Sequence, residues 1–135
     1  MIDTNVLVSA LLTAGANSRV LRACLLGQFR PLIGPALFLE YEELLGRPGM
    51  FDRSPLAATE RRELFASFLS VSEWVEVYYS WRPNLRDEGD NHLWELAVAG
   101  GAAMIVTNNV RDLRSGELRF PSIRVLTPLE LLKEL

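Results

Sequence analysis

The sequence contains very little cysteine, histidine or lysine: one residue of each among 135, with Lys133 close to the carboxyl end. A single thiol, Cys24, cannot form an internal disulfide, and with no second cysteine or nearby histidine it does not indicate a zinc site. Because Cys24 lies in an apolar run, we expect it to be a small core residue. The one histidine, His92, has no partner in the sequence, and we expect it at the surface or an interface rather than as a catalytic base.

Long hydrophobic runs and an excess of basic charge are also missing. No stretch approaches the roughly 20 apolar residues that a membrane span requires, and no secretory signal is recognisable, so we expect a cytoplasmic protein without membrane association. The net charge of −3 does not fit a protein that holds nucleic acid by charge alone, which is usually strongly basic. The composition, 49% hydrophobic and 23% charged, is that of an ordinary globular protein, and the length fits a single domain over residues 1–135.

What the sequence does contain is an alternation of short apolar segments and helical patterns. Apolar and β-branched segments predict strands at 1–2, 31–33, 74–79, 103–106 and 123–126. Caps, glycines and prolines predict helices at 6–12, 18–27 with Ser18 as N-cap, 35–45, 59–69, 90–100 and 129–135. This alternation predicts an α/β fold with a parallel sheet covered by helices on both faces.

Polar residues follow two of the predicted strands directly, and functional groups in such sheets collect beyond the carboxyl ends of the strands. Asp3 comes after the apolar pair 1–2, and residues 107–109 (Thr-Asn-Asn) come after the strand that ends at Val106. Asp90 stands at the start of a predicted helix, and Glu40 lies within another. Several acids are therefore expected to converge on one edge of the sheet.

Such a group of carboxylates suits the hydrolysis of phosphodiesters. That reaction needs an activated water and neutralisation of phosphate charge, and hard divalent cations held by oxygen ligands supply both. Each acid also has a structural interpretation. Asp3 and Asp90 are equally consistent with N-caps of the helices that follow them, Glu40 with a solvated helix residue, and Asp112 with a turn residue.

Four segments of the chain resemble, in order, the motifs of the PIN-domain family, in its branch of toxin-like members. They are MIDTNVLVSAL at 1–11, LEYEELLGRP at 39–48, DEGDNHLWELA at 87–97 and IVTNNVRDL at 105–113. The resemblance implies a three-layer α/β/α fold with a central parallel sheet, and a metal-dependent endoribonuclease that uses Mg²⁺ or Mn²⁺ to cleave single-stranded RNA. It also implies the toxin half of a prokaryotic toxin–antitoxin pair, which forms a homodimer and is silenced by a cognate antitoxin protein.

By position, the resemblance assigns the family's first three acids, as metal ligands, to Asp3, Glu40 and Asp90, with Glu43 as a competing candidate for the second. The fourth falls on Asn109, where many members carry aspartate, so that a neutral ligand or water-positioning group is expected there.

Further residues are expected to support this site. Asn5, Thr107 and Asp112 lie beside the assigned acids, and Arg86 and Arg111 are expected to guide the RNA backbone.

Two departures from the family pattern favour an alternative, a catalytically weak PIN-fold binding module. One is the missing charge at Asn109. The other is that only two residues precede Asp3, where the family's first strand usually has several, so that either the native start lies further upstream or Asp3 is less rigidly held.

A phosphatase of the haloacid-dehalogenase type is disfavoured. It needs a second aspartate where Asn5 stands, and, like a response-regulator receiver, a downstream lysine, whereas the only lysine is Lys133.

Overall fold

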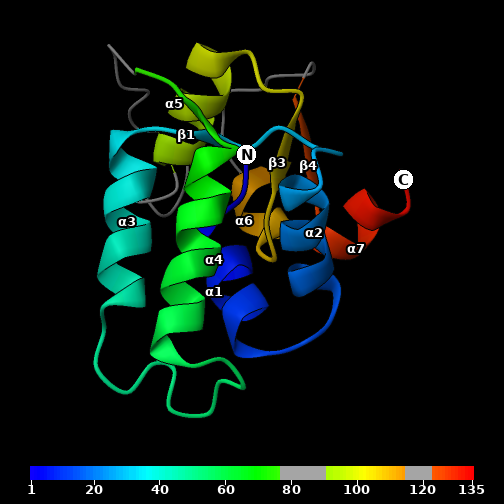
Figure 1. Cartoon of the computed structure of the whole chain (residues 1–135). Helices are drawn as coiled ribbons and strands as arrows, with labels where there is room; N and C mark the ends of the chain where they lie inside the picture. The colour runs from blue at the N-terminus through cyan, green and yellow to red at the C-terminus, as the bar shows by residue number, and fades with distance from the viewer. Residues whose placement is uncertain (77–90, 115–122) are drawn as a thin grey trace.

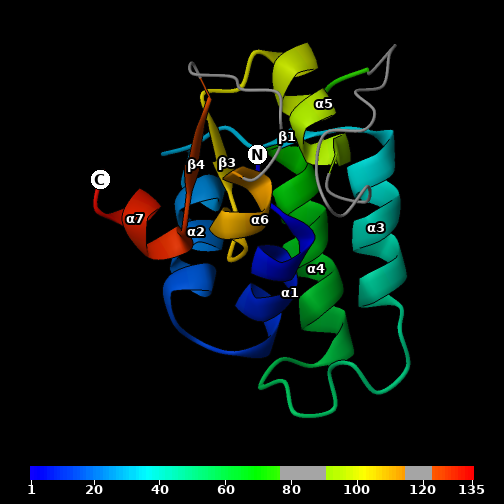
Figure 2. The ribbon, with the colours of Figure 1, turned by 180° about the vertical axis from the view of Figure 1, so that it is seen from behind.

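The computed structural model describes residues 1–76, 91–114 and 123–135, and Figures 1 and 2 show them from opposite sides. The elements follow in the order α1 (Thr4–Leu12), α2 (Ala16–Leu25), β1 (Leu32–Ile33), α3 (Pro35–Leu45), α4 (Ala58–Ser70), β2 (Glu73–Trp74), α5 (Asn91–Gly100), β3 (Met104–Val106), α6 (Val110–Arg114), β4 (Arg124–Leu126) and α7 (Pro128–Leu132). Helices lie on both sides of β3 and β4, with α2 on one side and α6 on the other. The predicted α/β class with parallel strands is confirmed.

The described strands form two parallel pairs. β1 pairs with β2 in the register Leu32↔Glu73 and Ile33↔Trp74, and β3 pairs with β4 from Met104↔Arg124 to Val106↔Leu126. The start of the chain runs beside β3, because Ile2 forms a parallel bridge with Val106. Asp3 and Thr107 therefore leave neighbouring extended segments at the same edge.

The first helices of the chain can be compared with the boundaries and caps predicted from the sequence. The helix predicted at 35–45 is confirmed as Pro35–Leu45, with proline in its first turn and Gly46 as its C-cap. The helix predicted from residue 6 begins at Thr4 instead, because Asp3 caps it. The prediction of Ser18 as an N-cap is wrong. The helix starts at Ala16, and the Ser18 hydroxyl, at its third position, accepts from the Gly15 N–H at 3.0 Å.

In the carboxyl-terminal part of the chain, the boundaries of helices and strands differ more from the predicted ones. The turn predicted around Asp112 is wrong, because helix α6 covers that position; the side chain of Asp112 lies outside the described residues. The predicted capping box is confirmed, since the Thr127 hydroxyl accepts from the Glu130 N–H at 3.2 Å. The last helix spans Pro128–Leu132 rather than 129–135, because the final N–H groups bond to carbonyls three residues back, in tight turns. The strand predicted at 74–79 is seen as Glu73–Trp74, one residue earlier, and residues 75–76 do not continue it; residues 77–79 are outside the described part.

The core holds the start of the chain in place. Tyr41 on α3 is fully buried, and its ring packs edge-on against Phe65 and Phe68 of α4. Its hydroxyl donates a hydrogen bond to the carbonyl of Ile2, the residue before Asp3. Burial, with the charges of Asp3, Cys24 and Glu40 adding to it, raises the Tyr41 pKa well above its usual value of 10, so the hydroxyl keeps its proton. Cys24 is 2% exposed, which confirms it as a core residue.

Within the described residues, none of the helices combines the length and the apolar character needed to cross a bilayer.

The amino-terminal ammonium of Met1 is buried and donates to the Met104 carbonyl at 2.9 Å. Burial lowers the pKa of this group from 8.0 to about 6, although the nearby Cys24 thiol acts weakly in the opposite direction. Between pH 6 and pH 8, the amino terminus is protonated in the unfolded chain but largely deprotonated in the folded chain. The free energy of unfolding therefore rises as the pH increases from 6 to 8. The full effect is at most about 3 kcal/mol.

We therefore expect a higher melting temperature at pH 8 than at pH 6, and we expect acetylation of the amino terminus to remove this difference. An acetylated Met1 keeps the N–H donor but carries no charge. Every other titrating group is the same in the two proteins, so a difference between their pH profiles reports on the amino terminus alone. Parallel pH profiles for the free and acetylated chains would contradict the expectation.

Candidate active site

Asp3 is 6% exposed, and hydrogen bonds hold both its backbone and its carboxylate. Its backbone N–H donates to the Val106 carbonyl at 2.9 Å, which ties it to β3. Its Oδ1 accepts from the Thr4 N–H at 2.7 Å and so caps α1. Its Oδ2 accepts from the Thr107 hydroxyl at 2.6 Å. The structure therefore bears out the N-cap interpretation of Asp3, and it also directs this carboxylate toward the segment that follows β3.

Thr107 connects Asp3 to Asn109. The residue is fully buried, and its N–H donates to the Leu126 carbonyl of β4 at 2.9 Å. Its hydroxyl donates to Asp3 and accepts from the Asn109 N–H at 2.9 Å. One side chain thus sets both the orientation of the carboxylate and the backbone conformation at Asn109.

Glu40 reaches the same region from α3. The hydroxyl of Thr4, a residue that is 1% exposed, donates to Glu40 Oε1 at 2.6 Å. Tyr41, the next residue on α3, holds the Ile2 carbonyl, so two successive residues of this helix are bonded to the first turn of the chain. This pairing brings a second carboxylate to the edge where Asp3 lies.

Three asparagine side chains are bonded together nearby. The Asn108 amide donates to the carbonyl oxygens of Asn5 at 3.4 Å and Asn17 at 3.3 Å. These contacts fasten the segment after β3 to α1 and α2, which keeps Asn109 beside the start of α1.

Several of these residues line a pocket of about 300 Å³, whose full lining is Asp3, Thr4, Asn5, Val8, Ser9, Glu40, Leu44 and Asn109. Its polar side chains are carboxylates, amides and hydroxyls, which are the oxygen ligands that hard divalent cations such as Mg²⁺ and Mn²⁺ prefer. Over residues 1–76, 91–114 and 123–135 there is no group of three His, Cys, Asp or Glu side chains able to hold a metal ion. The described pocket thus supplies two carboxylates and fits a cation that also takes amide oxygens, water or a further acid.

The structure brings together four of the residues singled out from the sequence: Asp3, Asn5, Glu40 and Asn109 line one pocket. Thr107 lies directly behind them. Asp90 and Arg86, the expected third acid and a substrate-binding arginine, lie outside the described residues, as does the side chain of His92.

Two other candidates are placed away from the pocket lining. Glu43 is exposed and forms an ion pair with Arg47, one turn further along α3. Arg111 is exposed on α6, and it is not among the residues that line the pocket.

Sequence reasoning missed the role of Thr4. Its position directly after an N-cap marks it only as a first-turn residue, and no sequence signal shows that its hydroxyl meets Glu40, 36 positions away. Ser9, Val8 and Leu44 were missed for the same reason, since each lines the pocket only because α1 packs against α3.

The family model described as PIN domain matches residues 1–111, a range that includes every residue lining the pocket. Searches among curated proteins and among solved structures found no match.

Proposed function

Because this chain belongs to the PIN-domain family, whose members are generally metal-dependent nucleases, we propose that it is a metal-dependent endoribonuclease. The observation that carries the proposal is the pocket in which Asp3, Glu40 and Asn109 meet at the carboxyl edge of the strands. Single-stranded RNA is the proposed substrate, and the toxin half of a toxin–antitoxin pair is the proposed role; both rest on the resemblance of the four sequence segments to toxin-like members.

Asp3, Glu40 and Asn109 would hold the cation, with Asp90 as the proposed third acid. When bound, Mg²⁺ or Mn²⁺ supplies neutralisation of phosphate charge and activation of the attacking water. Asn109 contributes an amide oxygen but no negative charge, so the proposed site carries one charge less than a site with aspartate at this position.

The chain's own residues prepare the site for that cation. Thr107 and the Thr4 N–H each donate to one oxygen of Asp3, which fixes the orientation of this carboxylate. The Thr4 hydroxyl does the same for Glu40. Because the residues that make these bonds are buried, the two carboxylates are held in place before any ligand arrives, which is what a metal site requires.

Contact with the RNA backbone is proposed for Arg86 and Arg111. Arg111 is exposed two residues after Asn109, at the start of a helix that follows the pocket edge. With a net charge of −3, the chain is not basic overall. We therefore propose that a few arginines, and not the overall charge of the protein, bind the RNA phosphates.

A homodimer and a cognate antitoxin are the proposed protein partners. Large apolar side chains that remain exposed are consistent with a protein interface. Leu39 of α3 is 63% exposed, and Trp74 of β2, whose ring packs edge-on against Phe38, is 50% exposed.

Substitution of Glu40 tests the proposed nuclease activity. We expect Glu40→Gln to reduce Mn²⁺-dependent cleavage of a mixed pool of single-stranded RNA at least tenfold, about 1.4 kcal/mol. Glu43→Gln is the matched control, because Glu43 lies on the same helix and pairs with Arg47 outside the pocket lining. Cleavage is measured with Mn²⁺ and again after chelation with EDTA.

Loss of cleavage in Glu40→Gln but not in Glu43→Gln supports the proposal. Equal loss in both variants, or cleavage that persists in EDTA, contradicts it.

The neutral Asn109 in the pocket favours one alternative, a PIN-fold module that binds RNA or protein with little hydrolysis. In that case the folded chain would show no measurable affinity for Mn²⁺.

A further inference from the structure

The pocket of the candidate active site extends beyond its acids, along the groove between α1 and α3. Both helices run from the edge of the strands toward the loop that joins α3 to α4 (Figure 1). Thr4 meets Glu40 at the start of this groove. Val8 and Leu44 lie one helical turn further along, about 6 Å at roughly 1.5 Å per residue, and both still line the pocket. The groove therefore has an acidic end and, one turn away, an apolar end.

The apolar end takes one aliphatic side chain from each helix. Val8 of α1 is 8% exposed, and Leu44 of α3 is half-buried. Ser9, which follows Val8, is also half-buried and lines the pocket, and over the part of the chain that the structure describes its hydroxyl has no hydrogen-bond partner. Ligand pockets typically combine apolar walls with a few polar groups that fix the orientation of the ligand. This end of the groove has that combination.

The size of the pocket limits what the apolar end can hold. Its volume of about 300 Å³ is at the small end of the range for ligand pockets, roughly 300–1,000 Å³. Beyond Val8, the Leu11 carbonyl accepts from the Ser54 hydroxyl at 2.7 Å, which fixes the loop between α3 and α4 beside the end of α1. The pocket therefore has room for one further ligand group beside the acids, and not for several.

We propose, on the basis of the proposed function, that the apolar end is a nucleobase subsite for the nucleotide whose phosphate lies at the Asp3–Glu40 end. The base lies against Val8 and Leu44, and the Ser9 hydroxyl forms a hydrogen bond with its edge. A ribonucleotide has the same order of groups as the groove, since one sugar ring separates an anionic phosphate from a flat base with largely apolar faces. Unpaired RNA leaves its bases free for such contacts.

Aliphatic contact, and not ring stacking, is the expected source of affinity for the base. None of the described residues that line the pocket is aromatic. The contribution of the base to binding is therefore expected to be moderate, and preference among the bases is expected to depend on the hydrogen bond with Ser9.

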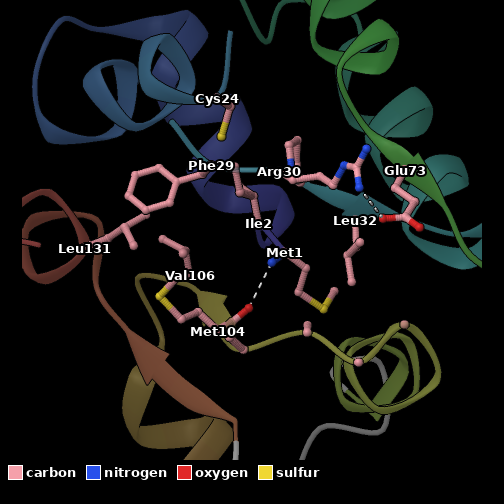
Figure 3. Close-up of a pocket in the computed structure, with 15 residues that line it drawn as sticks. Met1, Ile2, Cys24, Phe29, Arg30, Leu32, Glu73, Met104, Val106 and Leu131 are labelled. Atoms are coloured by element: carbon pink, nitrogen blue, oxygen red, sulfur yellow. Dashed lines mark hydrogen bonds and ion pairs between the residues drawn. The ribbon is translucent and has the colours of Figure 1, made fainter. Parts of the chain in front are cut away.

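The pocket around Met1, shown in Figure 3, is the control site within the same molecule. It has a volume of about 260 Å³, and two of its charged side chains, Arg30 and Glu73, form an ion pair at 3.7 Å. A phosphate held there would be bound by the Arg30 guanidinium and would need no cation. Nucleotide binding in that pocket would thus be independent of Mn²⁺, which separates the two sites in a titration.

Equilibrium dialysis of the folded full chain in saturating Mn²⁺ tests this proposal. The probes are the 5′-monophosphates of adenosine, guanosine, cytidine and uridine, with ribose 5-phosphate as the compound that lacks a base. We expect at least one nucleotide to bind at least fivefold more tightly than ribose 5-phosphate, because only the nucleotide reaches the apolar end. Leu44→Ala is expected to reduce this difference at least threefold and to leave the affinity for ribose 5-phosphate unchanged.

Two further variants keep the test specific. Leu39→Ala is the matched control, because Leu39 is a leucine of the same helix that is 63% exposed and is not among the described residues lining the pocket. Ser9→Ala is expected to change the ratio of affinities among the nucleotides at least threefold, again with no change for ribose 5-phosphate. Because alanine is a good helix former, this variant is expected to fold.

The possible failures of the subsite and of the proposed function can be told apart. A chain that binds Mn²⁺ but binds nucleotides no more tightly than ribose 5-phosphate would overturn the base subsite and leave the metal site intact. Equal loss of nucleotide affinity in Leu44→Ala and Leu39→Ala, or nucleotide binding that is the same without Mn²⁺, would also overturn the subsite. A folded chain without affinity for Mn²⁺ would overturn the proposed function and the subsite with it.

Discussion

Asp3→Asn is expected to abolish most metal-dependent RNA cleavage, by roughly a hundredfold or more, while the chain remains folded; a hundredfold corresponds to about 2.7 kcal/mol. The substitution removes one negative charge from a pocket that, in the described residues, is lined by two carboxylates. The measurement is the initial rate of Mn²⁺-dependent cleavage of single-stranded RNA, with thermal unfolding recorded on the same preparations.

Asparagine at this position keeps the helix-capping role of Asp3 but removes the negative charge proposed to bind the metal. Its side-chain oxygen still accepts from the Thr4 N–H, and asparagine is as good an N-cap as aspartate. Its amide can donate to the Thr107 hydroxyl but cannot accept from it, so the buried Thr107 O–H loses the acceptor that Asp3 provides. We therefore expect a loss of about 1–2 kcal/mol in the free energy of unfolding, from the Thr107 hydroxyl and not from the helix cap.

Asp3→Ala is the companion variant, because it removes the cap as well as the charge. It should cost an additional 0.5–2 kcal/mol or so of stability. If Asp3→Asn cleaves RNA at the wild-type rate, Asp3 is only a helix cap, and the proposed carboxylate site is wrong.

Thr107→Val should have the second largest effect, on both stability and metal affinity. Valine has nearly the same shape as threonine, but it can neither donate to Asp3 Oδ2 nor accept from the Asn109 N–H. Because Thr107 is fully buried, water does not replace these bonds. We expect a loss of about 2–3 kcal/mol in the free energy of unfolding.

The same variant should bind Mn²⁺ about 10–100-fold more weakly, as is usual when a group that orients a metal ligand is removed. Thr107→Ser is the control, since it keeps the hydroxyl and should retain most of the affinity. Urea unfolding and calorimetric titration measure the two effects. A Thr107→Val protein with wild-type affinity would show that the hydroxyl does not position Asp3 for a ligand.

Local signals in the sequence account for much of the predicted fold. Pro35 and Gly46 bound α3 as predicted, and the Thr127–Glu130 capping box starts α7. Asp3 and residues 107–109 were expected at one edge of the sheet because functional groups collect beyond the carboxyl ends of parallel strands, and the structure places Asp3 and Thr107 together there.

Other parts of the site depend on how the helices pack against one another, which no local sequence pattern predicts. Glu40 and Glu43 are three residues apart, about 60° around the helix, so the sequence alone leaves both as candidates. The way α3 packs against α1 separates them: Glu40 meets Thr4, and Glu43 faces solvent beside Arg47. The short helix α6 was missed because a single turn and a half carries too little periodicity to distinguish it from a turn.

Calorimetric titration of the folded, wild-type chain with Mn²⁺ is the sharpest test of the proposed carboxylate metal site, because it does not require the right RNA substrate. We expect saturable binding at the Asp3–Glu40 pocket, weakened at least tenfold, or about 1.4 kcal/mol, in Asp3→Asn. Absence of binding to a well-folded wild-type chain, or equal binding by the two proteins, would contradict a carboxylate metal site in this pocket and favour the binding-module interpretation.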